Sequence, residues 1–403
     1  MLLRFCRAHC SPATRLFSTV SRHTRIVAAT LDSDARRLTI QNEDEKRYSL
    51  PFAYAREHAL KTASKEPIRS AIRSGTVTPT KVRIVNDAAF VDWSTGEQTE
   101  IDSEWLARHF GRRESKAVSP FESLEKTYWR SDYDCHAANT VDFTDILNDD
   151  VKLLEFLKTL ERYGMVVINN ATSESGQLLK LAKRAGWLKS CIYGNLITVK
   201  SVQNHTNLAN TNIGLELHGD LPHLAYSPEY QMFHCIEQLS GPRAGAGWYS
   251  DGFAVASYLR KEFPRDFDIL SKSTVQFQYD VADYLDFNCE HWGPIIKLDR
   301  YGDIEAVFLT NSVRGDRFSH KMKSCLSDWY AAYRRFVQLA HNSRFITEVK
   351  LSPGQILVFD NLRIFHGRPE YLLKENREVR RLEVVYIDKD AVYAKARELL
   401  NFL

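Results

Sequence analysis

The sequence has few cysteines, and they lie far apart. Seven occur among 403 residues, none falls between Cys10 and Cys135, and no CxxC pair is present. This pattern argues against a disulfide framework and against a structural zinc site built from four cysteines. The cysteines are therefore expected to be reduced thiols.

Long apolar runs and a strong excess of one charge are also missing. No stretch reaches 18 apolar residues without a charge, which excludes a membrane-spanning helix. Lys and Arg number 54 and Asp and Glu 51, so the net charge is only +3. This balance argues against a protein that binds nucleic acid by neutralising its backbone. Apolar residues make up 44% of the chain, enough for a full-sized core.

Acidic residues are absent before Asp32, whereas residues 1–30 contain five Arg and seven Ser or Thr. An Arg-rich, Ser-rich and acid-poor start is typical of a mitochondrial transit peptide, with a processing site offered by Arg15–Ser18. We therefore expect residues 1–30 to direct the protein to the mitochondrial matrix. The alternative is a disordered basic tail on a cytosolic protein.

The rest of the chain divides into three segments. Residues 31–110 contain alternating runs such as Lys81–Val85 and a capped helical pattern over 103–110, which predict a small β-rich N-terminal domain. Residues 111–140 are charged and irregular, and are predicted to be a linker. Residues 141–403 form the main domain.

The main domain is predicted to be mainly β with flanking helices. Apolar spacing favours helices over 144–163, 174–186 and about 316–341. Strand-like runs follow one another from residue 190, and the strongest are Gln355–Asp360 and Arg381–Tyr386. Many short strands separated by Gly, Pro and Asn indicate a sandwich or jelly roll.

A candidate metal site begins with Leu217-His218-Gly219-Asp220. In an extended segment residues i and i+2 share a face, so His218 and Asp220 can present a nitrogen and an oxygen to one ion. His366, which follows a strong strand, is the candidate third ligand. Two His and one carboxylate leave three positions open and suit non-haem Fe(II) that activates O2. The alternatives are a histidine that merely packs beside an aspartate, and a zinc hydrolase with the same ligands.

Arg380 lies fourteen residues after His366, at the start of the next strand. A guanidinium grips a carboxylate through two parallel hydrogen bonds, so Arg380 could hold the distal carboxylate of 2-oxoglutarate. His234 lies in an apolar run and is expected to be a buried core histidine.

Several segments resemble, in order and spacing, the carnitine-biosynthesis dioxygenases, which are gamma-butyrobetaine dioxygenase and trimethyllysine dioxygenase. These segments are His218–Asp220, Phe233–Gln238, Asp251–Phe253, Phe359–Asn361, His366–Arg368 and Arg380–Glu383. The resemblance covers about residues 31–398. It implies a double-stranded β-helix, a smaller N-terminal domain and usually a homodimer.

The resemblance also implies cofactors and the residues that hold them. His218, Asp220 and His366 would be the ligands of Fe(II). Arg380 and Asn207 would bind 2-oxoglutarate, the co-substrate that is consumed together with O2. Ascorbate is the expected reductant.

The substrate of that family is a quaternary ammonium held in an aromatic cage, because cations are attracted to ring faces. Tyr193 and Tyr386 match two cage positions. The Trp position falls on Ile197, and another Tyr position falls on Asn210, which is expected to contact substrate. Other aromatic side chains that could complete the cage are Trp187, Tyr226 and Trp248.

The N-terminal domain departs from the butyrobetaine enzyme, which binds zinc there through a Cys-rich loop and a His. The corresponding stretch, Leu50–His58, contains no cysteine, and one histidine cannot form a four-ligand site. We expect no structural zinc, and a domain held together by apolar packing.

The resulting hypothesis is a dioxygenase that hydroxylates an unactivated C–H bond of a small betaine. Gamma-butyrobetaine is the first expected substrate, and trimethyllysine is the second, favoured by the matrix address. A related small acid without a full cation is a third possibility. A catalytically inactive jelly-roll protein is the non-enzyme alternative.

Overall fold

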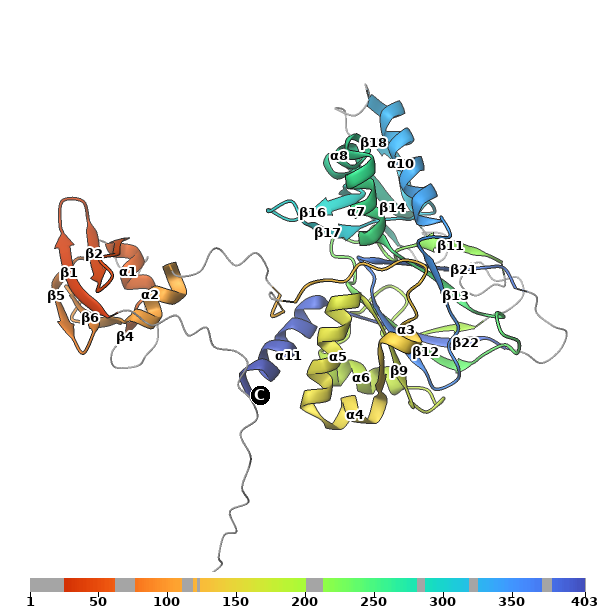
Figure 1. Ribbon diagram of the computed structural model, residues 1–403, viewed down its shortest axis with the longest axis horizontal. Coiled ribbons are helices and arrows are strands. Elements are labelled where there is room, and N and C mark those ends of the chain that lie inside the picture. Colours follow the sequence, from red (N-terminus) through yellow and green to blue (C-terminus); the bar gives the residue numbers. More distant parts are fainter. Residues whose placement is uncertain are drawn as a thin grey trace, which may run out of the picture. The chain divides into compact units, whose positions relative to one another are not determined.

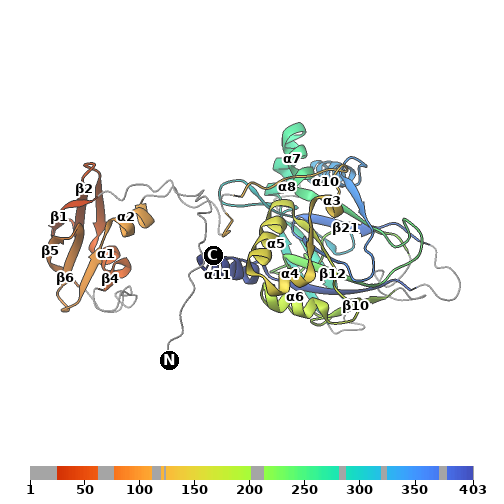
Figure 2. The ribbon, with the colours of Figure 1, turned by 60° about the horizontal axis from the view of Figure 1, so that its bottom comes forward.

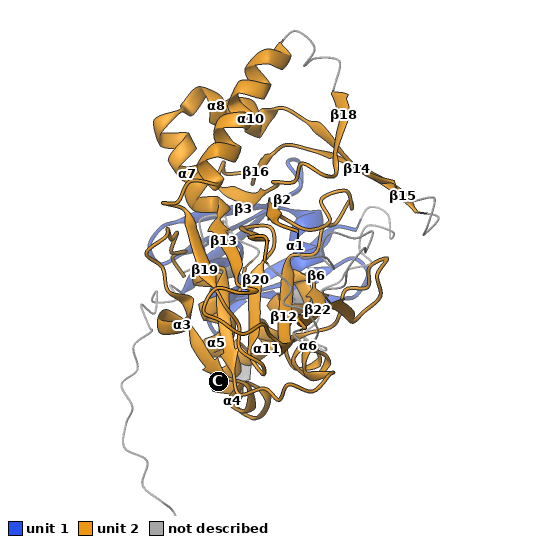
Figure 3. Cartoon of the chain, turned by 90° about the vertical axis from the view of Figure 1, so that its right-hand side faces the viewer, with its two compact units in different colours: residues 1–115 blue, residues 116–403 orange. Residues whose placement is uncertain are grey.

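The computed structural model divides into two compact units, residues 1–115 and 116–403 (Figure 3). The residues that it describes are 25–61, 77–110, 119–121, 124–200, 213–280, 287–318, 325–371 and 379–402. The expected ligand-binding residues Asn207 and Asn210 lie outside the described residues, as does most of the expected transit peptide.

The described residues of the first unit form two antiparallel sheets and two helices. One sheet has the order β1 (Ile26–Asp32), β2 (Arg37–Asn42) and β3 (Arg47–Pro51). The other has the order β4 (Leu60–Lys61), β7 (Gln98–Ile101), β6 (Ala88–Trp93) and β5 (Pro79–Val85). The helices are α1 (Phe52–His58) and α2 (Ser103–Phe110), the second of which has the predicted bounds. Trp105 of α2 is buried in the core and donates its indole N–H to the His58 carbonyl at 2.9 Å.

The second unit is built on two facing sheets. The larger has the order β10 (Ile197–Lys200), β22 (Arg381–Ile387), β12 (Tyr230–Glu237), β20 (Ile356–Asp360), β9 (Met165–Asn169) and β8 (Thr140–Asp142). The smaller has the order β11 (Leu215–His218), β21 (Ile364–Arg368), β13 (Gly247–Asp251) and β19 (Ile346–Val349). Neighbouring strands are antiparallel except β8 and β9.

The chain order of these strands defines the fold. We take the strands of these two sheets in chain order from β10 to β22. Each strand then lies in the other sheet from the one before it, except that β13 and β19 both belong to the smaller sheet. This alternation is the jelly-roll arrangement of a double-stranded β-helix. Strands β20, β21 and β22 are almost entirely buried, which explains the long apolar runs of β20 and β22.

A long insertion separates β13 from β19. Its elements are α7 (Gly252–Glu262), α8 (Pro264–Lys272), β14 (Val275–Asp280), β15 (Asn288–Gly293), β16 (Ile296–Leu298), β17 (Ile304–Val307), β18 (Arg314–Phe318) and α10 (Leu326–Ala340). Helices α7, α8 and α10 contact one another and lie together at one end of the unit (Figures 1 and 2). Their apolar faces form a core with Phe253, Trp329 and Phe336 fully buried.

The remaining helices pack against the larger sheet. They are α3 (Cys135–Ala138), α4 (Phe143–Asn148), α5 (Asp150–Tyr163), α6 (Gln177–Ala185) and α11 (Lys389–Phe402). Leu157 and Leu160 of α5 share a core with Met232 and Val358 of the sheet. Gly164 ends α5 at a φ of 72°, a conformation that glycine adopts without strain. Within the described residues, no helix is long and apolar enough to cross a membrane.

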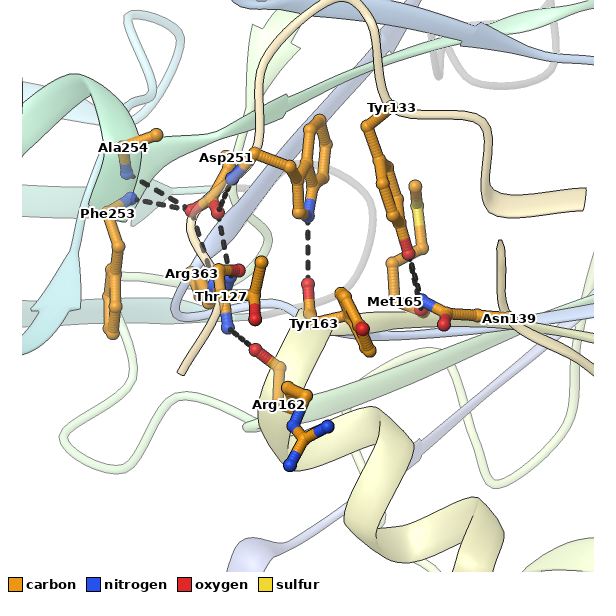
Figure 4. A network of polar contacts seen from close by, with 11 residues as sticks. Thr127, Tyr133, Asn139, Arg162, Tyr163, Met165, Asp251, Phe253, Ala254 and Arg363 are labelled. Carbon is orange, nitrogen blue, oxygen red and sulfur yellow. Dashed lines mark hydrogen bonds and ion pairs between the residues drawn. The ribbon is translucent and has the colours of Figure 1, made fainter. Parts of the chain in front are cut away.

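A buried ion pair between Asp251 and Arg363 joins the start of the insertion to the segment between β20 and β21 and to the end of α5 (Figure 4). Arg363 donates to both carboxylate oxygens of Asp251, at 3.2 and 2.7 Å, and both side chains are almost fully buried. Asp251 also caps α7 by accepting from the backbone N–H groups of Phe253 and Ala254. Arg363 further donates to the Arg162 carbonyl at 3.1 Å, so three chain segments meet at this pair.

Three predicted elements differ from the structure. The helix expected over 144–163 is two helices, because Asp149 leaves the helical conformation and caps α5 by accepting from Val151 N–H at 2.7 Å. The helix expected over 316–341 is wrong in its first part, since residues through Phe318 form β18 beside β14. Within the segment expected to be a linker, Trp129 is buried and donates to the Tyr163 carbonyl at 2.8 Å.

Candidate metal centre

The structure brings His218, Asp220 and His366 together. Strands β11 and β21 are neighbours, and His218 pairs directly with His366 across them. One ligand atom from each of the three residues lies within 4.8 Å of the others. His218 Nε2 is 3.3 Å from Asp220 Oδ1, and His366 Nε2 is 3.8 Å from Asp220 Oδ2. Two imidazole nitrogens and a carboxylate therefore converge on one point.

Asp220 lies in the turn after β11, and its orientation is fixed by hydrogen bonds. Its Oδ2 accepts from Gln231 Nε2 and from the Tyr386 hydroxyl, both at 2.7 Å. Asn361 accepts from the Asp220 backbone N–H at 2.7 Å and donates to the Asp220 carbonyl at 3.0 Å. Such partners hold a metal ligand in place. Neither Gln231 nor Asn361 was predicted to contact the site, and Tyr386 was predicted only to contact substrate.

Hydrogen bonding and charge act differently on the two histidines. His218 Nδ1 lies 2.8 Å from the Glu216 carbonyl, so Nδ1 carries the proton and Nε2 offers its lone pair. Burial opposes protonation of His218, but the hydrogen bond and charge of Asp220 outweigh it and raise its pKa. Burial, and the charge of His218, lower the pKa of His366 to about 3. Burial also disfavours ionised Asp220, but the histidines lower its pKa overall.

This donor set fits Fe(II). Two imidazoles and one carboxylate on one face are the ligands of non-haem iron oxygenases, and they leave positions for a chelating co-substrate and O2. The His218 and Asp220 side chains are 20% and 22% exposed, whereas His366 is 8% exposed. The ion would therefore be reachable from the side of His218 and Asp220.

Arg368 and Arg380 carry two buried guanidinium groups that act on each other. Arg380 is 8% exposed and its Nε donates to the Gly245 carbonyl at 3.3 Å. Burial lowers its pKa, and the neighbouring side chains of Tyr371, Tyr249 and Cys235 offset this only in part. Burial lowers the pKa of Arg368 as well, and the charge of Arg380 adds to that effect. Because Arg368 is two residues after His366 on β21, both side chains are on one face of the strand. This arrangement favours binding of an anion.

The predicted cage residues Tyr193 and Tyr386 share an apolar cluster with Leu221 and Ile197. Tyr193 donates from its hydroxyl to that of Tyr279 at 3.0 Å. Tyr279, which was not predicted from the sequence, comes from β14 of the insertion. Among the other aromatic candidates, Trp187 and Tyr226 are 54% and 84% exposed, and Trp248 packs against the core of the insertion.

A hollow of about 390 Å³ adjoins this cluster. Its lining residues are Ser190, Cys191, Ile192, Leu221, His223 and Leu224. Leu221 directly follows Asp220, so the hollow begins next to a proposed metal ligand. His234, expected to be a core histidine, is fully buried, and its Nε2 lies 2.9 Å from the Thr172 carbonyl.

The metal-free protein is expected to lose stability as the pH falls from about 6.5 toward 4. Burial lowers the pKa of His223 to about 4, whereas the unfolded value is about 6.5. In this window the unfolded chain binds a proton that the folded chain does not, so acidification favours unfolding by up to roughly 3 kcal/mol. Urea titrations with a chelator present would measure the effect.

The raised pKa of His218 acts in the opposite direction, so the contribution of His223 is isolated by His223→Leu. This variant should show a flatter dependence of the unfolding free energy on pH. Parallel profiles for the variant and the wild type would contradict the prediction.

Comparison with known proteins gives matches to dioxygenases. Residues 128–386 match the family model described as Taurine catabolism dioxygenase TauD, TfdA family. Gamma-butyrobetaine dioxygenase of Homo sapiens is 32% identical over 313 residues, which are 77% of this chain and 79% of that protein. Mitochondrial trimethyllysine dioxygenase of Rattus norvegicus is 25% identical over 337 residues, 80% of this chain and 75% of that protein. The solved structure of an asparagine oxygenase with Fe(II), 3-hydroxyasparagine and succinate aligns with a TM-score of 0.47 at 15% identity, over 59% of this chain and 79% of that one.

Proposed function

The chain belongs to the taurine catabolism dioxygenase TauD, TfdA family, and from that premise we propose that it is an Fe(II)- and 2-oxoglutarate-dependent dioxygenase acting on a small betaine. The observation that carries the proposal is the convergence of His218, Asp220 and His366 across β11 and β21. A protein that had only kept the fold would have no need of the hydrogen bonds that orient Asp220.

The side chains around the centre have distinct tasks in this proposal. Bound Fe(II) would supply the activation of O2 that is coupled to decarboxylation of 2-oxoglutarate. Gln231 and Tyr386 hold the Asp220 carboxylate, which leaves Oδ1 directed toward His218. Arg380, assisted by the charge of Arg368, binds the distal carboxylate of 2-oxoglutarate. The buried strands around the centre keep water away from the reacting groups.

Gamma-butyrobetaine is the proposed substrate, converted to carnitine by hydroxylation. Its support is the 32% identity to the human gamma-butyrobetaine dioxygenase, against 25% to the rat trimethyllysine dioxygenase. The rings of Tyr193 and Tyr279 offer faces that attract a quaternary ammonium. Trimethyllysine is the second candidate, because residues 1–30 resemble a transit peptide and the rat relative is named as mitochondrial. We further propose a matrix location, a homodimer, ascorbate as reductant and no structural zinc.

The test is succinate production by purified residues 18–403 with Fe(II), ascorbate and 2-oxoglutarate. Stimulation by gamma-butyrobetaine or by trimethyllysine establishes both class and substrate. Turnover that neither betaine stimulates retains the dioxygenase and redirects the search to a related small acid. If the iron-loaded protein, like the metal-free protein, forms no succinate, it is an inactive jelly roll or a zinc hydrolase.

Arg380→Leu is expected to raise the KM for 2-oxoglutarate by about 10–100-fold, because a charge-assisted hydrogen bond to a carboxylate is lost. Binding of Fe(II) should be retained, since Arg380 contributes no metal ligand. Arg380→Lys should recover only part of the affinity, because an ammonium lacks the two-pronged geometry. Initial rates against 2-oxoglutarate concentration would measure the change, and an unaltered KM would remove Arg380 from the binding site.

A further inference from the structure

His223 is a buried polar side chain without a hydrogen-bond partner. It is 2% exposed, and neither ring nitrogen is bonded to any group in the described part of the chain. Buried imidazole nitrogens are normally satisfied, because an unpaired donor or acceptor loses its hydration without compensation. Apart from Ser190, the other residues that line the same hollow present apolar groups or a thiol. The imidazole is thus the main polar side chain in the lining of this hollow.

The ring is held by its neighbours rather than by hydrogen bonds. It lies over Tyr279 with the ring centroids 5.0 Å apart and the planes tilted by 30°, and Phe287 approaches its edge at 6.2 Å. The Tyr279 hydroxyl is in turn bonded to Tyr193. His223 is therefore fixed beside the pair of rings formed by Tyr279 and Tyr193, three residues after Asp220. Burial keeps it neutral at physiological pH, with one N–H donor and one acceptor nitrogen.

The chemistry of a betaine limits what this imidazole can bind. A trimethylammonium group carries no N–H, so it can neither donate to nor accept from a histidine. The carboxylate is the hydrogen-bonding group of gamma-butyrobetaine, and it only accepts. We propose that His223 donates a hydrogen bond to the substrate carboxylate and thereby sets which carbon of the substrate faces the metal centre. The inference rests on the proposed function and names the end of the substrate that this residue recognises.

The experiment compares each betaine with its neutral carboxamide on wild type, His223→Leu and His223→Gln. The probes are gamma-butyrobetaine, trimethyllysine and their carboxamides. A hydrogen bond to a charged group is worth on the order of 10- to 100-fold in affinity, so His223→Leu should raise the KM for the acid by that factor. The preference of wild type for acid over amide should largely disappear in His223→Leu. His223→Gln, which keeps an N–H donor, should restore part of it.

Further measurements separate recognition from folding and from the proposed function. Calorimetric Kd values for the betaine on the Mn²⁺-loaded protein should change with the KM, while the KM for 2-oxoglutarate should stay constant. His136→Leu, a replacement of the half-buried histidine on α3, serves as the matched control and should behave as wild type. An unchanged ratio of acid to amide affinity in His223→Leu overturns the inference. Failure of wild type to bind or convert either betaine instead overturns the proposed substrate class.

Discussion

His366→Ala is expected to reduce 2-oxoglutarate-dependent succinate formation by more than about 100-fold, because loss of even a hydrogen-bond partner of a metal ligand costs ~10–100-fold. His366 offers Nε2 to the same point as His218 and Asp220. With alanine at this position, two protein ligands remain, and the ion is held too weakly and with too many open positions. Activity and retained iron after dialysis should both fall.

The control for this prediction is a histidine outside the centre. His136→Ala changes a half-buried side chain on α3 and should leave succinate formation and iron content at wild-type levels. Near-UV circular dichroism of both variants would establish that the packed core is retained. A folded His366→Ala protein that turns over at the wild-type rate would show that the three residues do not hold the metal.

Asp251→Ala is expected to lower the free energy of unfolding by about 3–5 kcal/mol, because it leaves the buried Arg363 guanidinium without its counter-charge. The same substitution removes the carboxylate that caps α7 through Phe253 N–H. It also removes the acceptor of the Trp129 backbone N–H at 3.2 Å. All of these contacts lie in the network of Figure 4. Urea denaturation followed by tryptophan fluorescence would measure the loss.

An exposed ion pair provides the comparison. Lys297 Nζ lies 3.1 Å from Glu305 Oε1 between β16 and β17, and both side chains are about half exposed. Glu305→Ala should cost at most about 1 kcal/mol, because water screens such pairs. Equal losses of unfolding free energy for Asp251→Ala and Glu305→Ala would contradict the prediction that burial makes loss of the Asp251–Arg363 pair more costly.

The three residues of the proposed metal site stand out in the sequence because their pattern is short and local. An aspartate two positions after a histidine is conspicuous, and His366 follows a strand whose burial is evident from its composition. The direct pairing of His218 with His366 could not be predicted from the sequence, since it depends on β21 lying beside β11. Nor was the orientation of Asp220 correctly derived. The residue lies beyond the end of β11, and hydrogen bonds rather than strand geometry direct it.

Other features were hidden because they depend on contacts distant in sequence. Gln231 is a lone amide in an apolar strand, and such a residue signals a buried partner, although not which one. Residues through Phe318 became a strand instead of a helix because β14 offers an edge to pair with, and strand formation follows such context more than intrinsic preference. Tyr279 reaches Tyr193 from the insertion, a contact that no spacing near His218 could reveal.

The Asn361 side chain is hydrogen-bonded to both the backbone N–H and the carbonyl of Asp220, and this has a consequence for metal selectivity. The protein itself fixes one carboxylate and two imidazoles, by these hydrogen bonds and by the strand pair that carries the histidines. Affinity of such nitrogen and oxygen sites rises from Mn²⁺ through Fe²⁺, Co²⁺ and Ni²⁺ to Cu²⁺, whatever the intended ion. Nickel, cobalt and copper are therefore expected to compete with iron for the same three atoms when they are available. The supply of ions in the compartment would then decide, together with the ligand geometry, which metal the proposed site carries.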